Sequence, residues 1–206
     1  MHTSYYNQLH QVPESLLNCL VTAYIEGYGV PPWNEHWTRS RVRRKLAREL
    51  ACSTAFLSIM EGDETDPVAG TCWGASIRRT AIPERVVQAH PIRGGKAAVA
   101  GLLTAVNEET LTYVDEIVLI ERYRHRGPEP IVRLVLPVGE CAIREQNGIF
   151  CWSGAGSNII KVLRRHWGFR ALGSVGDISF FYLPPPEAQE RSEDVVQFVA
   201  ALDHAA

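Results

Sequence analysis

An almost continuous apolar run that leads into a glycine–proline turn limits the fold of this chain more than any other feature of its sequence. Residues 117–120 are all apolar and lie within a β-prone stretch at residues 111–123, which is the pattern of a strand buried on both faces. Gly127 and Pro128 then turn the chain into a helical pattern at residues 130–145. The sequence therefore predicts a buried strand, a tight turn and a helix in succession.

This strand–turn–helix unit predicts an anion site. The first amides of a helix have no acceptor within the helix, and the helix dipole adds positive charge at the same end. Three arginines precede the turn and supply further positive charge: Arg122, Arg124 and Arg126. The pattern fits the binding of a phosphorylated cofactor, and it fits equally well a solvated basic strand end that binds nothing.

The rest of the chain alternates helical and strand patterns. Helical spacing and helix-start signals predict helices at residues 13–29, 38–51, 97–106, 157–168 and 192–202. β-prone runs predict strands at residues 53–61, 68–77, 149–152, 170–175 and 178–183. The first two strands form a hairpin with an acidic turn, and Thr38 has the side chain of an N-cap. This order of elements predicts a mixed α/β or α+β domain.

Length and charge narrow the class of protein. The chain has 206 residues, which suits a single domain at residues 1–206. We interpret residues 78–110 as an insertion and residues 186–206 as a C-terminal helical extension. A formal charge of −2 gives no general reason to expect nucleic acid as a partner. No apolar run approaches the ~20 residues of a membrane span, and no secretory signal is evident, so we expect a cytoplasmic protein.

No metal site is expected. The five cysteines form no C-x-x-C pair, and the seven histidines show no pairing typical of ligands. The cysteines lie in apolar stretches, which favours reduced thiols in the core.

Two motifs give the chain a resemblance to a known family. The turn after the buried strand fits the pattern R/Q-x-x-G-x-G/A at all but its last position, with the residues Arg124-His125-Arg126-Gly127-Pro128-Glu129. A later segment at residues 163–169 is similar to L-Y-x-x-x-G-F. In this order and at this separation the motifs resemble the GNAT superfamily of acyl-CoA N-acyltransferases over residues 13–183. The loop with Pro31, Pro32 and Trp33 fits the N-terminal half of that family more weakly.

The resemblance implies a fold, a co-substrate and a set of binding residues. The fold would be α+β, with a central, mostly antiparallel sheet of about six to seven strands flanked by helices. The co-substrate would be acetyl-CoA, with its pyrophosphate on the amides of residues 126–131. The residues that the resemblance assigns to coenzyme binding are Val118, Leu119, Ile120, Arg124, Arg126, Gly127, Pro128, Glu129, Ser157, Asn158 and Arg164. The first three would hold the acyl carbonyl and the pantetheine arm through their backbone.

The sequence departs from the family pattern at two of these positions. Glu129 places a carboxylate where the family has a glycine or alanine, and like charges ~4 Å apart repel by about 1 kcal/mol in water. An acidic residue in the first turn also stabilises the helix, which gives Glu129 a purely structural explanation. Arg164 stands where many members have a tyrosine that protonates the departing thiolate. A thiol of pKa about 8.5 leaves without such an acid, and Arg164 can steady the anion electrostatically.

The resemblance also implies a catalytic residue. An acceptor amine is protonated at neutral pH and must lose a proton before it attacks. Glu116 lies where some members place a general base, and burial among apolar residues would raise its pKa. Asp115, on the opposite face of the strand, is its rival. A third interpretation makes Glu116 a strand-end residue paired with an arginine.

We therefore predict an N-acyltransferase that transfers acetyl from acetyl-CoA to a small-molecule or peptide amine. Tyr28, Trp33 and Trp37 are candidates for the wall of an acceptor pocket, although core packing is the commoner role of such residues. One alternative is a catalytically degenerate protein that keeps the fold and binds a ligand or a partner. Another is an acyltransferase acting on a macromolecule, for which the arginine-rich helix at residues 38–51 is the only indication. The commoner explanation of that helix is a solvated charged face, which includes Lys45, opposite a buried apolar stripe. No membrane partner is expected, and a homodimer is left open.

Overall fold

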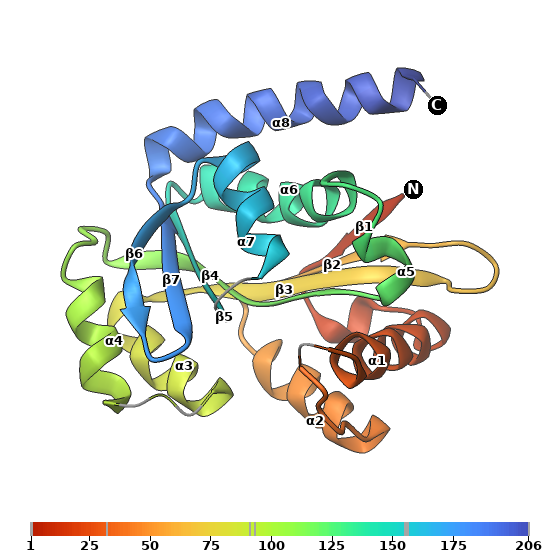
Figure 1. Cartoon of the computed structure of the whole chain (residues 1–206), viewed down its shortest axis with the longest axis horizontal. Coiled ribbons are helices and arrows are strands. Elements are labelled where there is room, and N and C mark those ends of the chain that lie inside the picture. Colours follow the sequence, from red (N-terminus) through yellow and green to blue (C-terminus); the bar gives the residue numbers. More distant parts are fainter. Residues whose placement is uncertain (1, 32, 91, 93, 155–156, 206) are drawn as a thin grey trace. The chain divides into compact units, whose positions relative to one another are not determined.

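The computed structural model describes residues 2–31, 33–90, 92, 94–154 and 157–205. Its helices, labelled in Figure 1, are α1 (Glu14–Gly29), α2 (Arg39–Glu49), α3 (Ile82–Ala89), α4 (Gly95–Leu103), α5 (Glu121–Arg124), α6 (Glu129–Arg144), α7 (Asn158–Val162) and α8 (Pro185–Ala205). Its strands are β1 (Thr3–Tyr6), β2 (Ala55–Glu61), β3 (Val68–Arg78), β4 (Thr110–Leu119), β5 (Gly148–Gly154), β6 (Arg170–Val175) and β7 (Ile178–Leu183). Pro32, part of the weaker family motif, lies outside the described residues.

The described strands form one seven-stranded sheet in the order β1-β2-β3-β4-β5-β7-β6. The pairs β1–β2, β2–β3, β5–β7 and β6–β7 are antiparallel, whereas β4 and β5 are parallel. The predicted fold class, a mixed α+β domain with a mostly antiparallel sheet of six to seven strands, is therefore confirmed.

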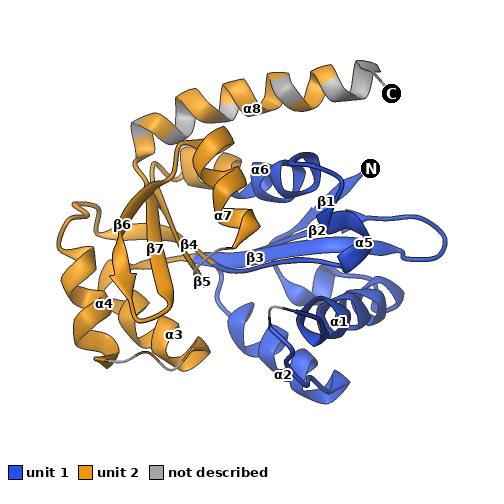
Figure 2. Ribbon diagram, in the orientation of Figure 1, with its two compact units in different colours: residues 1–75, 115–138 blue, residues 76–114, 139–206 orange. Residues whose placement is uncertain are grey.

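The chain divides into two compact units (Figure 2). Unit 1 contains Met1–Ala75 and Asp115–Val138, and unit 2 contains Ser76–Val114 and Gly139–Ala206. Strands β3 and β4 and helix α6 each contribute residues to both units.

In unit 1, α1 and α2 lie on one face of the strands and the first part of α6 on the other (Figure 2). The predicted hairpin pairs Leu57 with Trp73. Two glycines bring neighbouring elements close together. A Cβ on Gly27 of α1 would lie 2.4 Å from Val118 Cγ1, and a Cβ on Gly70 of β3 would lie 2.7 Å from the Val118 carbonyl oxygen. Helix α1 and strand β3 are therefore both packed tightly against the end of β4.

Unit 2 has its own apolar core between helices α3 and α4 and the strands β4, β5 and β7. Its buried members are Ile82, Val86, Val99, Leu103, Val106, Leu111, Tyr113, Phe150, Ile178, Phe180 and Tyr182. The apolar run at residues 97–106, predicted to be helical, supplies one wall of this core as α4. Residues 78–110 thus contribute core residues as well as surface.

Several boundaries differ from the sequence prediction. Strand β4 ends at Leu119, and residues 121–124 form the short helix α5 instead of prolonging the strand. Helix α6 continues through Pro137. The last turn before Gly168 is a π-helix at residues 163–167, and α8 begins at Pro185, seven residues before the predicted start. Among the described residues, no helix combines the length and the apolar composition that a membrane span needs.

Candidate functional site

The predicted turn at Gly127 is present, although the short helix α5 lies between it and the end of β4. Gly127 adopts a φ of +78°, a left-handed conformation that favours glycine. A Cβ on Gly127 would meet no atom within 4 Å. Glycine is therefore favoured here by the backbone conformation and not by a lack of space for a side chain. Helix α6 begins two residues later, at Glu129. Since the first amides of a helix lack acceptors within the helix, the amides of Glu129 and Ile131 are donors at this end, whereas Pro130 has no N–H and the Val132 amide donates to the Pro128 carbonyl.

Arg124 is held within unit 1 by backbone carbonyl groups. Its Nε donates to the Leu119 carbonyl at 2.9 Å and its Nη1 to the Pro31 carbonyl at 3.2 Å, while Nη2 donates to the Gly27 carbonyl. Burial lowers the pKa of its guanidinium. The guanidinium therefore ties the end of β4 to the end of α1 and the loop that follows α1.

The other two arginines before the turn have different surroundings. Arg122 forms ion pairs with Asp63 and Asp66 of the β2–β3 hairpin. The guanidinium of Arg126 stacks on the Tyr123 ring, 4.3 Å from its centroid, and the residue is exposed. Within the part of the chain that the structure describes, Arg126 has no carboxylate partner. Of the three, it is the arginine whose charge is open to a ligand.

Glu129 is paired along its own helix. Its Oε1 accepts a hydrogen bond from Arg133 Nε at 2.8 Å, one turn further along α6. The Glu129 side chain is 27% exposed and that of Arg133 is 10% exposed. The carboxylate at the departing motif position is thus partly neutralised by a neighbouring cation.

Glu116 lies at the centre of a buried ionic cluster. Its Oε1 is 2.8 Å from Lys45 Nζ of α2, and its Oε2 accepts a hydrogen bond from the Tyr28 hydroxyl of α1. Lys45 also contacts Glu49 Oε1 at 2.9 Å, and Trp73 Nε1 donates to Glu49 Oε2 at 3.0 Å. The side chains of Lys45, Glu49 and Glu116 are 8%, 7% and 10% exposed. Glu116 is therefore paired with a lysine, where the sequence suggested an arginine as the alternative to a catalytic role.

Burial and charge act in opposite directions on this cluster. Burial raises the pKa of Glu116 and outweighs the nearby Lys45 ammonium, which acts to lower it. Burial alone would lower the pKa of Lys45, but the carboxylates of Glu116 and Glu49 raise it above its usual value. Burial alone would raise the pKa of Glu49, but the Lys45 ammonium and hydrogen bonds from Trp73 and other donors hold it below its usual value. Lys45 is thus cationic at neutral pH, and Glu116 is the carboxyl group of this cluster that is easier to protonate.

An aromatic group surrounds Tyr28. Its ring centroid lies 4.7 Å from that of Tyr24 and 5.7 Å from that of Trp33. Trp37 meets Tyr24 edge to face at 5.2 Å, and the Arg41 guanidinium lies 4.2 Å above the Trp37 ring. The three aromatic residues singled out from the sequence therefore lie together, with Tyr24 as a fourth member, and Tyr28 connects them to Glu116.

The remaining predicted residues are placed as follows. In unit 1 the Leu119 carbonyl accepts from Arg124, and the Ile120 amide donates to the Ala69 carbonyl at 3.1 Å. Asp115 is buried. In unit 2, Ser157 is at the N-cap of α7, and Asn158 Oδ1 accepts from Lys161 Nζ at 3.0 Å.

Arg164 belongs to the π-helical turn that follows α7, and it is exposed. Leu163 and Trp167 of the same turn are buried. The turn thus directs its apolar residues into unit 2 and its arginine outward.

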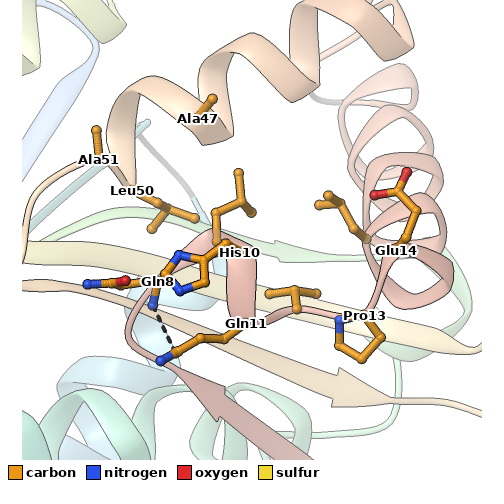
Figure 3. A pocket seen from close by; sticks show the side chains of 11 residues that line it. Gln8, His10, Gln11, Pro13, Glu14, Ala47, Leu50 and Ala51 are labelled. Carbon is orange, nitrogen blue, oxygen red and sulfur yellow. Dashed lines mark hydrogen bonds between the residues drawn. The ribbon is translucent and has the colours of Figure 1, made fainter.

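A cavity of about 850 Å³ lies in another part of unit 1 (Figure 3). Residues 8–14, Leu17, Ala47, Leu50 and Ala51 line it, and no residue that the sequence assigned to the site is among them. Gln11 Oε1 accepts from the Gln8 amide at 3.2 Å at its edge. Among the described residues no cluster of three His, Cys, Asp or Glu side chains is arranged to hold a metal ion.

Sequence comparison finds neither a protein-family model nor a curated protein that matches this chain. Comparison of structures finds many matches. An uncharacterized protein of Bacillus halodurans has a TM-score of 0.62 at 14% identity, with 96% of this chain and 91% of that chain covered. The polyamine N-acetyltransferase of Drosophila melanogaster has a TM-score of 0.55 at 13% identity, with 89% and 100% covered.

A third match is the GNAT superfamily phosphinothricin acetyltransferase of Sinorhizobium meliloti in complex with AcCoA. Its TM-score is 0.55 at 14% identity, with 89% of each chain covered. These similarities extend over most of both chains. The chain has the fold of the GNAT superfamily.

Proposed function

We propose that this protein is an N-acetyltransferase that uses acetyl-CoA and an amine acceptor. The observation that carries the proposal is the turn between β4 and α6. Gly127 in a left-handed conformation, the amino-terminal end of a 16-residue helix and the exposed cation of Arg126 are together suited to a diphosphate. The matched enzyme from Sinorhizobium meliloti carries AcCoA in its structure, which supports the same co-substrate here.

Glu116 supplies the proton acceptor in this proposal. Acetyl-CoA provides an activated acyl group, which an amine attacks directly to form an amide and release the thiol. The amine must lose one proton as the new C–N bond forms. Glu116 is suited to receive it, directly or through a water molecule, because a carboxylate can accept about four hydrogen bonds and the structure records two. Its raised pKa brings its basicity closer to that of a useful base.

In the same proposal the Arg126 side chain and the amides of Gly127, Glu129 and Ile131 bind the diphosphate, since Pro128 and Pro130 have no N–H. Arg124 holds the end of β4 against α1 and the loop that follows α1 through its three carbonyl contacts. In unit 2, Ser157, Asn158 and Arg164 remain predicted coenzyme contacts, and Tyr28, Trp33 and Trp37 remain predicted contacts for the acceptor.

The alternative is a protein that keeps the fold without catalysis. Two observations favour it: Glu129 places a carboxylate in the first turn of α6, and Arg124 is already bonded to the protein's own carbonyl groups. Both features weaken a diphosphate site, although the Arg133 guanidinium offsets the charge of Glu129.

Titration with acetyl-CoA, followed by the melting temperature and by tryptophan fluorescence, separates the two functions. A ligand at 100 times its Kd stabilises a protein by about 2.7 kcal/mol, which for a chain of this size raises the melting temperature by roughly 5–10 °C. Arg126→Gln should reduce the shift, whereas Arg39→Gln, a control on α2, should leave it intact. A melting temperature that stays constant up to millimolar acetyl-CoA would refute the proposal.

If acetyl-CoA binds, release of free thiol across a panel of amines tests the chemistry. Glu116→Gln should lower kcat/KM by about 10²–10⁴-fold, the usual contribution of a general base, while acetyl-CoA affinity stays within a few fold. A variant that keeps the wild-type rate would remove Glu116 from the mechanism.

A further inference from the structure

Lys45 stands apart from the other basic residues of α2. The arginines at positions 39, 41, 44 and 48 are exposed, whereas the Lys45 side chain is only 8% exposed. Its ammonium lies 2.8 Å from Glu116 Oε1 and 2.9 Å from Glu49 Oε1. One buried cation is therefore shared by two buried carboxylates that come from different elements.

Glu49 binds the same ammonium as Glu116. The carboxylate of Glu49 is fixed by Trp73 Nε1 at 3.0 Å and by Arg48 Nη2 at 2.9 Å. Because Glu49 is one helical turn after Lys45, it holds the lysine side chain along α2 while the ammonium contacts Glu116. The geometry fixes the position of one oxygen of Glu116, and the Tyr28 hydroxyl fixes the other.

A stability role alone accounts poorly for this cluster. Removing ions from water costs several kcal/mol each, and well-packed apolar side chains of similar volume are often as stable or more stable. The cluster also contains Glu116, the carboxylate that the proposed chemistry needs. This points to a role in setting the state of Glu116.

We propose that Lys45 is a positioning residue that keeps Glu116 ionised and oriented, so that Glu116 can accept the proton of the acceptor amine. This inference rests on the proposed function and adds to it a residue that the sequence placed among solvated charges. Lys45 acts through Glu116, and no contact of its own with the acceptor or the co-substrate is needed.

Two neighbours of Glu116 make opposite electrostatic contributions, which gives the inference a sharp test. The Lys45 ammonium lowers the pKa of Glu116, and the Glu49 carboxylate raises it. The titratable and charged groups that act on Glu116 or on its neighbours are Tyr24 and Tyr28 of α1, Arg41, Lys45 and Glu49 of α2, and Glu35 of the loop between those helices, with Asp115 next to Glu116 in β4. Of these, Lys45 is the cation that contacts Glu116.

The experiment compares Lys45→Met with Glu49→Gln. Both variants break the same buried cluster, so a purely structural role predicts similar losses for both. The inference predicts opposite shifts: the pKa of Glu116 rises by at least one pH unit in Lys45→Met, since a cation at this distance shifts a carboxyl by about 1–3 units, and it falls in Glu49→Gln.

Two readouts follow each variant. The first is a carbon-13 NMR titration of glutamate carboxyl groups, in which Glu116→Gln assigns the Glu116 signal, and it needs no acceptor. The second is the acidic limb of the pH profile of kcat/KM for thiol release, which should move in the same directions. Lys45→Arg, which keeps the charge, should restore most of the wild-type profile.

The outcomes distinguish this inference from the function on which it rests. A wild-type protein that acetylates amines while the Glu116 titration and the acidic limb stay within 0.3 pH units (about twofold) in both variants overturns the role of Lys45 alone. Shifts of the same sign in both variants also overturn it. A wild-type protein that binds no acetyl-CoA and releases no thiol overturns the proposed function, and with it the role of Lys45 in proton transfer. Should Lys45→Met fail to fold, Lys45→Gln takes its place, and a pKa of Glu116 that stays unchanged in that variant overturns the inference.

Discussion

Replacement of Arg124 by glutamine should cost stability more than it costs coenzyme affinity. The guanidinium donates to three backbone carbonyl groups, of Leu119, Pro31 and Gly27. Hydrogen bonds from a charged donor contribute about 1.5–3 kcal/mol each, and water replaces part of this loss because the residue is only half-buried. We therefore expect the free energy of unfolding to fall by about 2–4 kcal/mol, a large part of the 5–15 kcal/mol typical of a domain.

Arg126→Gln is the matched control for this experiment. It makes the same chemical change two residues later, where the structure records stacking on Tyr123, a contact of about 0.5–1 kcal/mol. Urea denaturation followed by both fluorescence and circular dichroism gives the two free energies of unfolding. Below the unfolding transition, acetyl-CoA affinity should change less than threefold in Arg124→Gln and fall roughly tenfold in Arg126→Gln. If the two variants lose equal stability, or if Arg124→Gln is the one that loses affinity, the internal role of Arg124 is refuted.

Three further changes have expected outcomes that the structure defines. Gly139→Ala would place a Cβ 2.5 Å from two ring carbons of Trp167. The free energy of unfolding should therefore fall by about 1–3 kcal/mol, measured as a lower melting temperature. The control Gly101→Ala, with no atom within 4 Å of its new Cβ, should be neutral or stabilising. Thr38→Ala removes the hydroxyl that accepts a hydrogen bond from the Arg41 amide at the start of α2. It should lower the free energy of unfolding by about 1 kcal/mol in urea denaturation. Glu129→Gln removes a negative charge from the first turn of α6 and should tighten acetyl-CoA about fivefold by isothermal titration calorimetry, since about 1 kcal/mol of repulsion is relieved; weaker binding would contradict this.

The elements predicted from sequence were those whose signals are local. The hairpin of β2 and β3 has two β-prone runs and an acidic turn between them, and the two strands pair antiparallel as predicted. Thr38 caps α2 through its side chain as predicted. Strand β1 was missed because four residues show too few alternations to be recognised. Helix α3 was missed because Pro83 looks like a breaker, although the first turn of a helix accepts proline.

Only part of the candidate site could be predicted from the sequence. The buried carboxylate of Glu116 follows from the apolar strand around it, and the turn at Gly127 follows from its glycine. Lys45 was assigned to a solvated face because arginines surround it, yet it flanks Val42 and Leu46, which are fully buried. Its partner Glu116 lies on a distant strand, and no local pattern indicates a long-range ion pair. A charged residue directly beside a buried stripe, with an opposite charge four positions later, is the signal that would have raised the question.

Arg124 connects the end of β4 with the loop that leads to the aromatic group. The same guanidinium holds the strand that carries Glu116, through Leu119, and the loop that follows α1, through Pro31. That loop leads to Trp33, whose ring lies 5.7 Å from that of Tyr28, the hydrogen-bond donor to Glu116. Arg124, which the family motif assigns to the coenzyme, is therefore positioned to order the aromatic residues that we propose as contacts for the acceptor. Because its three acceptors are backbone carbonyl groups, a change of side chain around it leaves this link intact, and only a change of Arg124 itself removes it.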